Sequence, residues 1–218
     1  MTIAEAYRTL REEIGETCRR LHRDPHEITL IAVSKTVPAE RVREAWAAGV
    51  RDLGENRVQE LLTKGPLLED LDVRWHLIGH LQTNKVRTAL PHVSLIHSVD
   101  RLSLIDEIER RADRIIPVLL QVNVTGEASK SGAAPDDVAR LIDEVRRRSR
   151  LSLCGFMTIG PLEGGDPETR RAFADLRALR DRSAREHPDL DLSILSMGMS
   201  GDWPLALAEG ATHLRVGT

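Results

Sequence analysis

The chain has 218 residues and a formal net charge of −3, with 41% hydrophobic and 30% charged residues. This balance indicates a folded protein rather than a disordered one, and the charge offers no general attraction to nucleic acid or an anionic membrane. Aromatic residues make up only 3%, which leaves few platforms for stacking bases. The two cysteines, Cys18 and Cys154, form no CxxC pair and cannot build a disulfide framework. No apolar run approaches a membrane span and the N-terminal segment has no signal-peptide core, so we expect a cytoplasmic protein.

Segment 2–23 predicts a charged amphipathic helix, which Asp24 and Pro25 end. Beyond it, apolar runs of strand length alternate with charged stretches of helical periodicity. The eight apolar runs are 28–35, 51–56, 74–80, 94–100, 115–124, 151–159, 192–200 and 212–217. The clearest helical stretches between them are 39–49, 57–64, 136–148, 167–187 and the short 204–210.

Alternating strands and helices favour a parallel sheet built of right-handed βαβ units. Eight units predict a closed (β/α)8 TIM barrel, of the α/β class, because an open doubly wound sheet usually has five or six strands. The repeats leave no segment for a second domain, so we expect residues 1–218 to form a single one. No helix follows the last run. We expect the N-terminal helix to cover that gap and the natural chain to extend slightly beyond Thr218.

The carboxyl ends of the strands are where such barrels carry their chemistry. Polar side chains expected there are Lys35, Asn56, His80, Asp100, Asn123, Thr158, Ser200 and Arg215. Lys35 ends the first run on the same face as Ile31 and Val33. Against an apolar wall its pKa would fall, and the neutral amine would be a nucleophile for aldehydes. Alternatively, the lysine reaches solvent at the strand end or pairs with a carboxylate such as Glu55.

The loops after the seventh and eighth runs have the composition of a phosphate site. Segment 196–202 is rich in glycine and precedes the short helix 204–210. Loops at these two places often bind phosphate in TIM barrels through backbone N–H groups. Gly198 would allow close backbone approach, and Ser200 and Thr218 could add hydroxyl donors. Two ordinary turns would also explain the glycines.

Metal ligation and thiol chemistry have little support in the sequence. His76 and His80 are four residues apart on a predicted strand, and no HExxH motif is present, so we expect no metal site. Cys154 lies within a predicted strand and is expected to pack rather than react. The arginine-rich segment 146–150 is typical of a solvated helix end.

Seven segments in order carry a resemblance to a known family. They are IAVSKTVPAERVREAWAAGVRDLGENRVQE (31–60), WHLIGHLQTNKVR (75–87), SVDR (98–101), QVNVTGEASKSG (121–132), GFMTIGP (155–161), LSMGMSGDW (195–203) and AEGATHLRVGT (208–218). Together they resemble the pyridoxal 5′-phosphate (PLP) homeostasis protein family, whose members are alanine-racemase-like, single-domain PLP-binding barrels of fold type III without the C-terminal β-domain. The ordered set covers nearly the whole chain.

The resemblance implies that Lys35 forms a Schiff base with PLP, a form of vitamin B6, and that Asn56 lies beside the cofactor. It also implies that the phosphate contacts Ser200, Gly217 and Thr218.

Two further positions match basic residues of the family. Arg215 corresponds to the arginine that faces the pyridine nitrogen, and Lys130 matches a family lysine whose role is not specified by the resemblance. A permanently cationic arginine disfavours protonation of that nitrogen and weakens PLP as an electron sink, which suits a carrier.

Three functions are compatible with these residues. The resemblance favours a carrier or buffer of PLP in intracellular homeostasis, with indirect effects on amino-acid and keto-acid pools. The alternative is a weak PLP-dependent amino-acid racemase, but two-base racemisation needs groups on opposite faces of the substrate, and the only tyrosine is Tyr7 in the N-terminal helix. A Schiff-base aldolase of phosphorylated sugars would explain Lys35 and the phosphate loops, and the resemblance argues against it. We therefore expect at most weak racemase-type activity, a monomer, and PLP-dependent apo-enzymes as partners.

Overall fold

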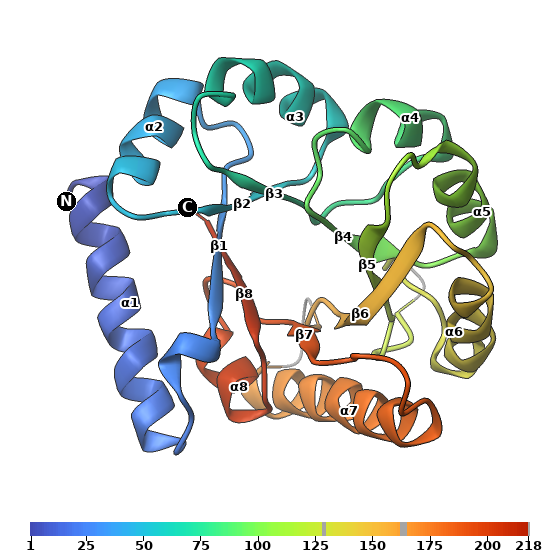
Figure 1. Cartoon of the computed structure of the whole chain (residues 1–218). Helices are drawn as coiled ribbons and strands as arrows, with labels where there is room; N and C mark the ends of the chain where they lie inside the picture. Colours follow the sequence, from blue (N-terminus) through green and yellow to red (C-terminus); the bar gives the residue numbers. More distant parts are fainter. Residues whose placement is uncertain (128–129, 162–164, 218) are drawn as a thin grey trace.

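Eight parallel strands close into a barrel in which each strand pairs with its neighbours in chain order (Figure 1). The computed structural model describes residues 1–127, 130–161 and 165–217. The strands are β1 (Thr29–Val33), β2 (Asp52–Glu55), β3 (Arg74–Leu77), β4 (Leu95–Val99), β5 (Ile116–Gln121), β6 (Leu151–Met157), β7 (Ile194–Ser196) and β8 (His213–Val216). Each predicted apolar run contains one of these strands, so the expected (β/α)8 barrel is confirmed.

Helices form the outer ring of the barrel (Figure 1). They are α1 (Ile3–Arg20), α2 (Ala39–Ala47), α3 (Val58–Lys64), α4 (Val86–Ala89), α5 (Leu102–Arg111), α6 (Val138–Arg146), α7 (Gly165–Glu186) and α8 (Trp203–Ala208). Short 3-10 helices lie at Pro25–Glu27, Gly65–Leu68, Thr83–Lys85 and Pro135–Asp137. The expected helical segments 2–23, 39–49, 57–64, 136–148, 167–187 and 204–210 each correspond to one of the α-helices.

The strands bury side chains on both faces, because the alternation of a strand sends every second residue to the opposite side. Outward-facing residues such as Leu53 and Leu120 pack with helical residues such as Phe173 in the main core. A separate small cluster, formed around Leu95 and Leu119, lies on the other face of β4 and β5. Much of the remaining barrel interior is polar, as described below.

The strand β6 contains a bulge that changes which residues face the interior. Val118 pairs with Leu153 and Leu119 with Gly155, so Cys154 is an extra residue in β6. Gly155 has a φ of +144°, and a Cβ there would lie 2.0 Å from the carbonyl oxygen of Ile194. Only glycine therefore fits this close approach of β6 to β7.

The helix α1 lies outside β1 and β8, between α2 and α8, where a helix following β8 would pack (Figure 1). Arg23, just beyond α1, donates to the carbonyl oxygens of Leu207 and Ala211 at 2.8 Å each. The expectation that the N-terminal helix covers this gap is confirmed. An apolar cavity of about 320 Å³ remains between α1, α2 and the outer face of β1.

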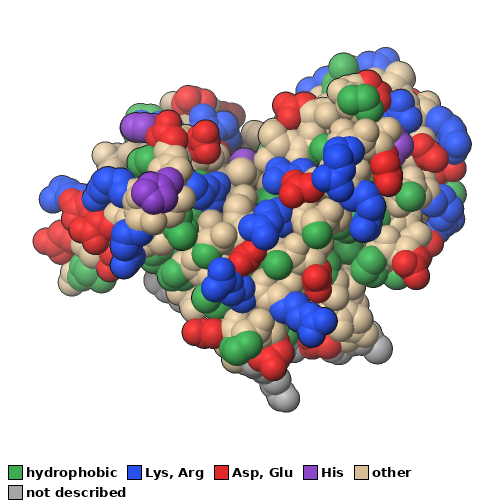
Figure 2. Space-filling model, turned by 90° about the horizontal axis from the view of Figure 1, so that it is seen from below, with side chains coloured by type: hydrophobic (Ala, Val, Ile, Leu, Met, Phe, Trp, Pro, Cys, Tyr) green, Lys and Arg blue, Asp and Glu red, His purple; other side chains and the backbone are tan. Residues whose placement is uncertain are grey.

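The molecular surface carries many charges of both signs. On the face that Figure 2 shows, acidic and basic side chains are interspersed over the helices. Among the helices of the described residues, none combines the length and the apolar character that crossing a bilayer requires.

Candidate functional site at the barrel mouth

The first and last strands bring most of the expected site residues to one edge of the barrel mouth. β1 pairs with β8, with Ile31 opposite Arg215. The loop after β7 joins this edge, because the Ser200 hydroxyl donates to the Gly217 carbonyl oxygen at 2.7 Å and accepts from the Gly217 N–H at 3.3 Å. Lys35 follows β1 by two residues and lies at the same end of the barrel.

Of the two remaining expected residues, the structure describes one and not the other. Asn56 follows β2, the other neighbour of β1, and is exposed at the mouth. Thr218 lies outside the described residues, so its expected contact with a phosphate stays a prediction.

Lys35 is exposed in the turn between β1 and α2. The sequence left open that Lys35 is buried against an apolar wall, but the structure leaves its side chain exposed. Nor does it pair with Glu55, whose carboxylate pairs with Lys64 at 2.8 Å. Within the part of the chain that the structure describes, no hydrogen bond or ion pair engages the Lys35 ammonium. The amine is therefore open to a ligand.

The backbone on both sides of Lys35 is held by α3. The Lys64 ammonium donates to the Ser34 carbonyl oxygen at 2.5 Å and to Glu60 Oε2 at 2.8 Å. The same Glu60 oxygen accepts from the Thr36 N–H at 2.7 Å. Thr36 has a φ of +62°, a left-handed conformation that costs a β-branched residue energy and persists only when its surroundings hold it. We call Lys64 and Glu60 the α3 clamp, because they fix the peptide groups that flank Lys35.

Glu55 is the buried carboxylate that pairs with Lys64 of this clamp. Its side chain is 1% exposed, and Oε1 accepts from the Ser34 hydroxyl at 2.7 Å and from Lys64 at 2.8 Å. Oε2 is buried and has no hydrogen-bond partner among the described residues. Burial raises the pKa of the Glu55 carboxyl, and the hydrogen bonds from Lys64 and Ser34 oppose that rise. The ammonium of Lys64 therefore offsets part of the cost of a carboxylate under the Lys35 turn.

Arg215 is buried inside the barrel, below the mouth. Its guanidinium donates to Ser196 Oγ at 2.6 Å and to the Thr158 carbonyl oxygen at 2.8 Å. Burial lowers the pKa of Arg215 to about 10, against the opposing charge of Asp202. The group is still cationic at neutral pH.

A row of hydrogen-bonded side chains continues from Ser196 across the barrel interior. Ser196 Oγ lies 2.8 Å from His97 Nδ1, His97 Nε2 lies 3.0 Å from His76 Nδ1, and His76 Nε2 lies 3.0 Å from Asp52 Oδ1. Arg74 closes the row with two hydrogen bonds to Asp52, at 2.7 and 2.6 Å. We call Ser196, His97, His76 and Asp52 the interior chain.

The interior chain was not found from the sequence. His76 was compared only with His80 on its own run, whereas its partner His97 is 21 residues away on the neighbouring strand. The available signal is that His76, His97 and His213 all occupy inward positions of their strands. Among the described residues, no group of three or more His, Cys, Asp or Glu side chains is arranged to hold a metal ion.

Lys130 lies across the mouth from Lys35, after β5. Its ammonium donates to Glu127 Oε1 at 2.6 Å and to the Gly160 carbonyl oxygen at 2.8 Å. It borders a pocket of about 250 Å³ that His80 and Asn123 also line. Unlike Lys35, this lysine has its amine engaged.

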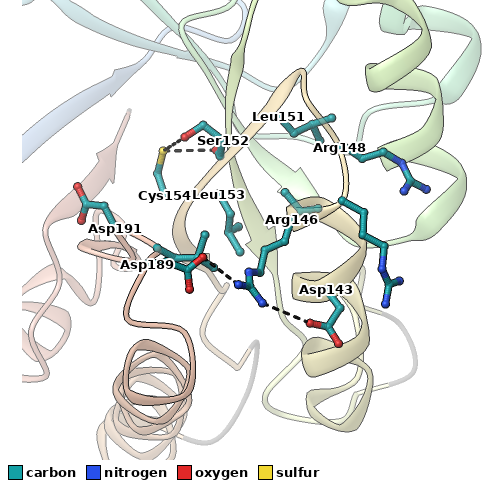
Figure 3. A pocket seen from close by; sticks show the side chains of 12 residues that line it. Asp143, Arg146, Arg148, Leu151, Ser152, Leu153, Cys154, Asp189 and Asp191 are labelled. Atoms are coloured by element: carbon teal, nitrogen blue, oxygen red, sulfur yellow. Dashed lines mark hydrogen bonds and ion pairs between the residues drawn. The ribbon is translucent and has the colours of Figure 1, made fainter.

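A larger depression, of about 750 Å³, lies at the opposite end of the barrel, where β6 begins (Figure 3). Its Arg146 pairs with Asp189 at 2.9 Å and approaches Asp143 at 3.9 Å, so carboxylates already neutralise this arginine. Cys154 Sγ donates to the Ser152 carbonyl oxygen, and burial raises the pKa of the Cys154 thiol. A protonated thiol beside paired charges is not a reactive centre.

Comparison with known proteins places this barrel in a family. The family model described as alanine racemase, N-terminal domain, matches residues 10–218. The chain is 44% identical over 220 residues to a pyridoxal phosphate homeostasis protein of Pseudomonas aeruginosa, covering 100% of this chain and 94% of the relative. It is 42% identical over 221 residues to a protein of the same name from Aquifex aeolicus, covering 100% and 96%. The chain belongs to the pyridoxal phosphate homeostasis protein family, whose barrel is that of the alanine racemase N-terminal domain.

Solved structures show the same fold. PipY of Synechococcus elongatus with PLP bound is 42% identical, with a TM-score of 0.83 over 94% of this chain and 97% of that chain. Its structure without PLP is 43% identical, with a TM-score of 0.86 over the same shares. Alanine racemase of Corynebacterium glutamicum shares the fold at 16% identity, with a TM-score of 0.74 over 98% of this chain and 58% of the racemase. The rest of the racemase lies outside the shared barrel.

Proposed function

We propose that this protein binds PLP at the barrel mouth through a Schiff base with Lys35 and acts as a carrier of the cofactor in PLP homeostasis. The observation that carries the proposal is the open amine of Lys35 at the same barrel edge as the Ser200–Gly217 loop pair and Arg215. The name of its relatives and the PLP-bound structure of PipY support PLP as the ligand.

The residues at this edge match the chemical groups of PLP. An aldehyde needs an amine that is not engaged elsewhere, which Lys35 provides. A phosphate needs hydroxyl and backbone donors, and Ser200 and Gly217 lie together there. The pyridine ring needs polar side chains beside its nitrogen and beside its other polar groups, and Arg215 and Asn56 are suited to these places. When bound, PLP would supply an electrophilic carbon that reacts with amines.

A carrier is favoured over a racemase by two features. Arg215 is cationic and therefore disfavours protonation of the ring nitrogen, which leaves PLP a weak electron sink. Tyr7, the only tyrosine, lies in α1 outside the barrel, where its hydroxyl donates to the Gly49 carbonyl oxygen at 3.5 Å. It is therefore not placed to act as a second base opposite Lys35. PLP-dependent apo-enzymes as recipients, a cytoplasmic location and a monomeric state stay predictions.

The proposal is tested by the visible spectrum of the purified protein with added PLP, before and after borohydride reduction, followed by peptide mapping. We expect a yellow protein whose reduced adduct maps to Lys35. Lys35→Ala should abolish the adduct, whereas Lys130→Ala, at the same mouth but with its amine engaged in the native protein, should retain it.

A reduced adduct on another lysine in wild type would contradict the assignment of Lys35. A colourless protein that takes up no PLP would contradict the cofactor and leave the sugar-phosphate aldolase as the better explanation. Racemisation of amino acids at a rate typical of enzymes would contradict the carrier role.

A further inference from the structure

The interior chain connects Arg215, near the mouth, to the carboxylate of Asp52, at the start of β2. His97 and Ser196 are fully buried, and His76 is 5% exposed. The function proposed above uses Arg215 but leaves these side chains without a role. Buried imidazoles at strand positions that an apolar residue would fill more cheaply require an explanation.

The direction of each hydrogen bond in the chain follows from what each group can donate. Arginine has no acceptor, so Ser196 Oγ accepts from Arg215 and its own proton is free for His97 Nδ1. A neutral His97 that accepts at Nδ1 carries its proton on Nε2 and donates to His76 Nδ1. His76 in turn carries its proton on Nε2, where it donates to Asp52. Every group is satisfied, and all the bonds point from the mouth towards Asp52.

The reverse order is costly. If His97 donated to Ser196, the serine hydroxyl proton would have no partner in the chain. His97 Nε2 would then have to accept from His76, and His76 would need both ring protons to meet Asp52 as well. That arrangement adds a second positive charge inside the barrel beside Arg215, with His213 only 6.3 Å from His97 between ring centroids. Burial lowers the pKa of His97 well below its usual range, which also favours the neutral form.

We propose that His97 is a positioning residue for Arg215: its Nδ1 accepts a hydrogen bond from the Ser196 hydroxyl, which keeps Ser196 an acceptor for the guanidinium and holds Arg215 aimed at the ligand ring. The inference rests on the proposed function for the identity of that ligand. Among the described residues, no carboxylate pairs directly with Arg215, and the successive hydrogen bonds all run from its guanidinium towards Asp52. The guanidinium makes no side-chain hydrogen bonds among the described residues other than those to Ser196 and Thr158, so its remaining N–H groups are available to a ligand.

The first test uses the protein without ligand. Long-range ¹H–¹⁵N spectra of the histidine rings should show His97 neutral near neutral pH with its proton on Nε2, and a proton on His76 Nε2. Rotation of the Arg215 guanidinium, assigned with Arg215→Lys, should be slow in wild type and about tenfold faster in His97→Phe, because one hydrogen-bonded support is lost.

Two variants separate positioning from packing. His97→Asn places an amide where Nδ1 stood and should restore slow rotation by accepting from Ser196 again. His213→Phe makes the same change of ring within the barrel, but His213 bonds to Thr212 and not to the chain, so the Arg215 rotation should stay as in wild type.

The second test adds PLP. His97→Phe should weaken PLP binding about tenfold and shift the pH profile of the bound absorption band, whereas His97→Asn and His213→Phe should stay within about twofold of wild type. A proton on Nδ1 of His97, or equal Arg215 rotation in wild type and His97→Phe, would overturn the inference. If wild type takes up no PLP, the proposed function fails, and the ligand-free spectra still decide whether His97 positions Arg215.

Discussion

The turn that carries Lys35 is held through the peptide groups of its two neighbours, while the Lys35 side chain itself stays open. The α3 clamp reaches the Ser34 carbonyl and the Thr36 N–H with a lysine and a glutamate that also pair with each other. A lysine held in this way has a fixed backbone, while no hydrogen bond among the described residues occupies its amine.

Replacing Lys64 with Met should destabilise the protein by about 3–5 kcal/mol, because Glu55 would be left buried without its cation. Urea unfolding measures the loss. Lys85→Met is the control, since within the described residues Lys85 forms no ion pair; it should change stability by less than about 0.5 kcal/mol. Adding Glu55→Gln to Lys64→Met should recover part of the loss. A Lys64→Met variant as stable as wild type would show that the buried pair is not needed.

Strand ends were accessible to sequence reasoning, whereas contacts between strands were not. Lys35, Asn56 and Ser200 could be placed at the mouth because each ends an apolar run. Lys64 can pair with Glu55 only because its turn of α3 lies beside β2. His76 can pair with His97 only because the register of the neighbouring strands β3 and β4 brings the two residues together. That register is set by the closure of the whole barrel and has no local signal.

At the scale of elements, a side-chain link joins α1 to α8 in the outer ring. Arg23 follows α1 and donates to the carbonyl oxygens of Leu207, in the last turn of α8, and of Ala211, just beyond it. A cation at the carboxyl end of a helix is also favoured by the helix dipole. This contact keeps α1 in the outer ring beside β1, the strand that leads to Lys35.

Replacing Arg23 with Met should cost about 2 kcal/mol of stability, because two hydrogen bonds from a charged donor are lost. Arg20→Met is the matched control: Arg20 donates only to Thr17 of its own helix among the described residues and should cost less than about 0.5 kcal/mol. Thermal or urea unfolding compares the two. Equal losses would mean that the link to α8 contributes nothing particular.

The number and order of strands followed from the apolar runs, but their lengths did not. The run 192–200 contains only the three residues of β7. The strand cannot continue through Gly198, whose φ is +92° and whose position leaves no room for a Cβ, since one would lie 2.6 Å from that of Ala206. An apolar run indicates which residues are buried. Buried loop residues next to a strand lengthen the run, although they do not belong to the sheet.

At the scale of the whole molecule, the barrel interior keeps imidazoles neutral. Burial lowers the pKa of His213 to about 4 and the pKa of His97 well below 6.5. In the unfolded chain both would take up protons near pH 6.5. Between pH 6.5 and the lower pKa values of these histidines in the folded protein, the unfolded state binds more protons than the folded state. The contribution of the two histidines to stability is therefore fully present above pH 6.5 and is lost as the pH falls below it.

The free energy of unfolding should therefore decrease from about pH 7 to about pH 4.5, with a slope of up to ~2.7 kcal/mol per pH unit for two histidines. Urea unfolding at several pH values measures the slope. His213→Asn should reduce it by ~1.4 kcal/mol per pH unit. An unchanged slope in that variant would mean that His213 is already charged in the folded protein. Asp52, whose pKa is held low by Arg74 and His76 against its burial, affects stability only below about pH 3.8.

Only four of the 31 basic side chains are lysines: Lys35, Lys64, Lys85 and Lys130. Two of these amines are engaged by Glu55 and Glu127. Free aldehydes condense with primary amines, and a surface rich in lysine would compete with the specific site for a reactive vitamer. Guanidinium groups supply the same charge without being comparable nucleophiles at neutral pH. The intact mass of the protein after exposure to excess aldehyde and borohydride should therefore show few adducts, and loading at the mouth can be counted against a low background.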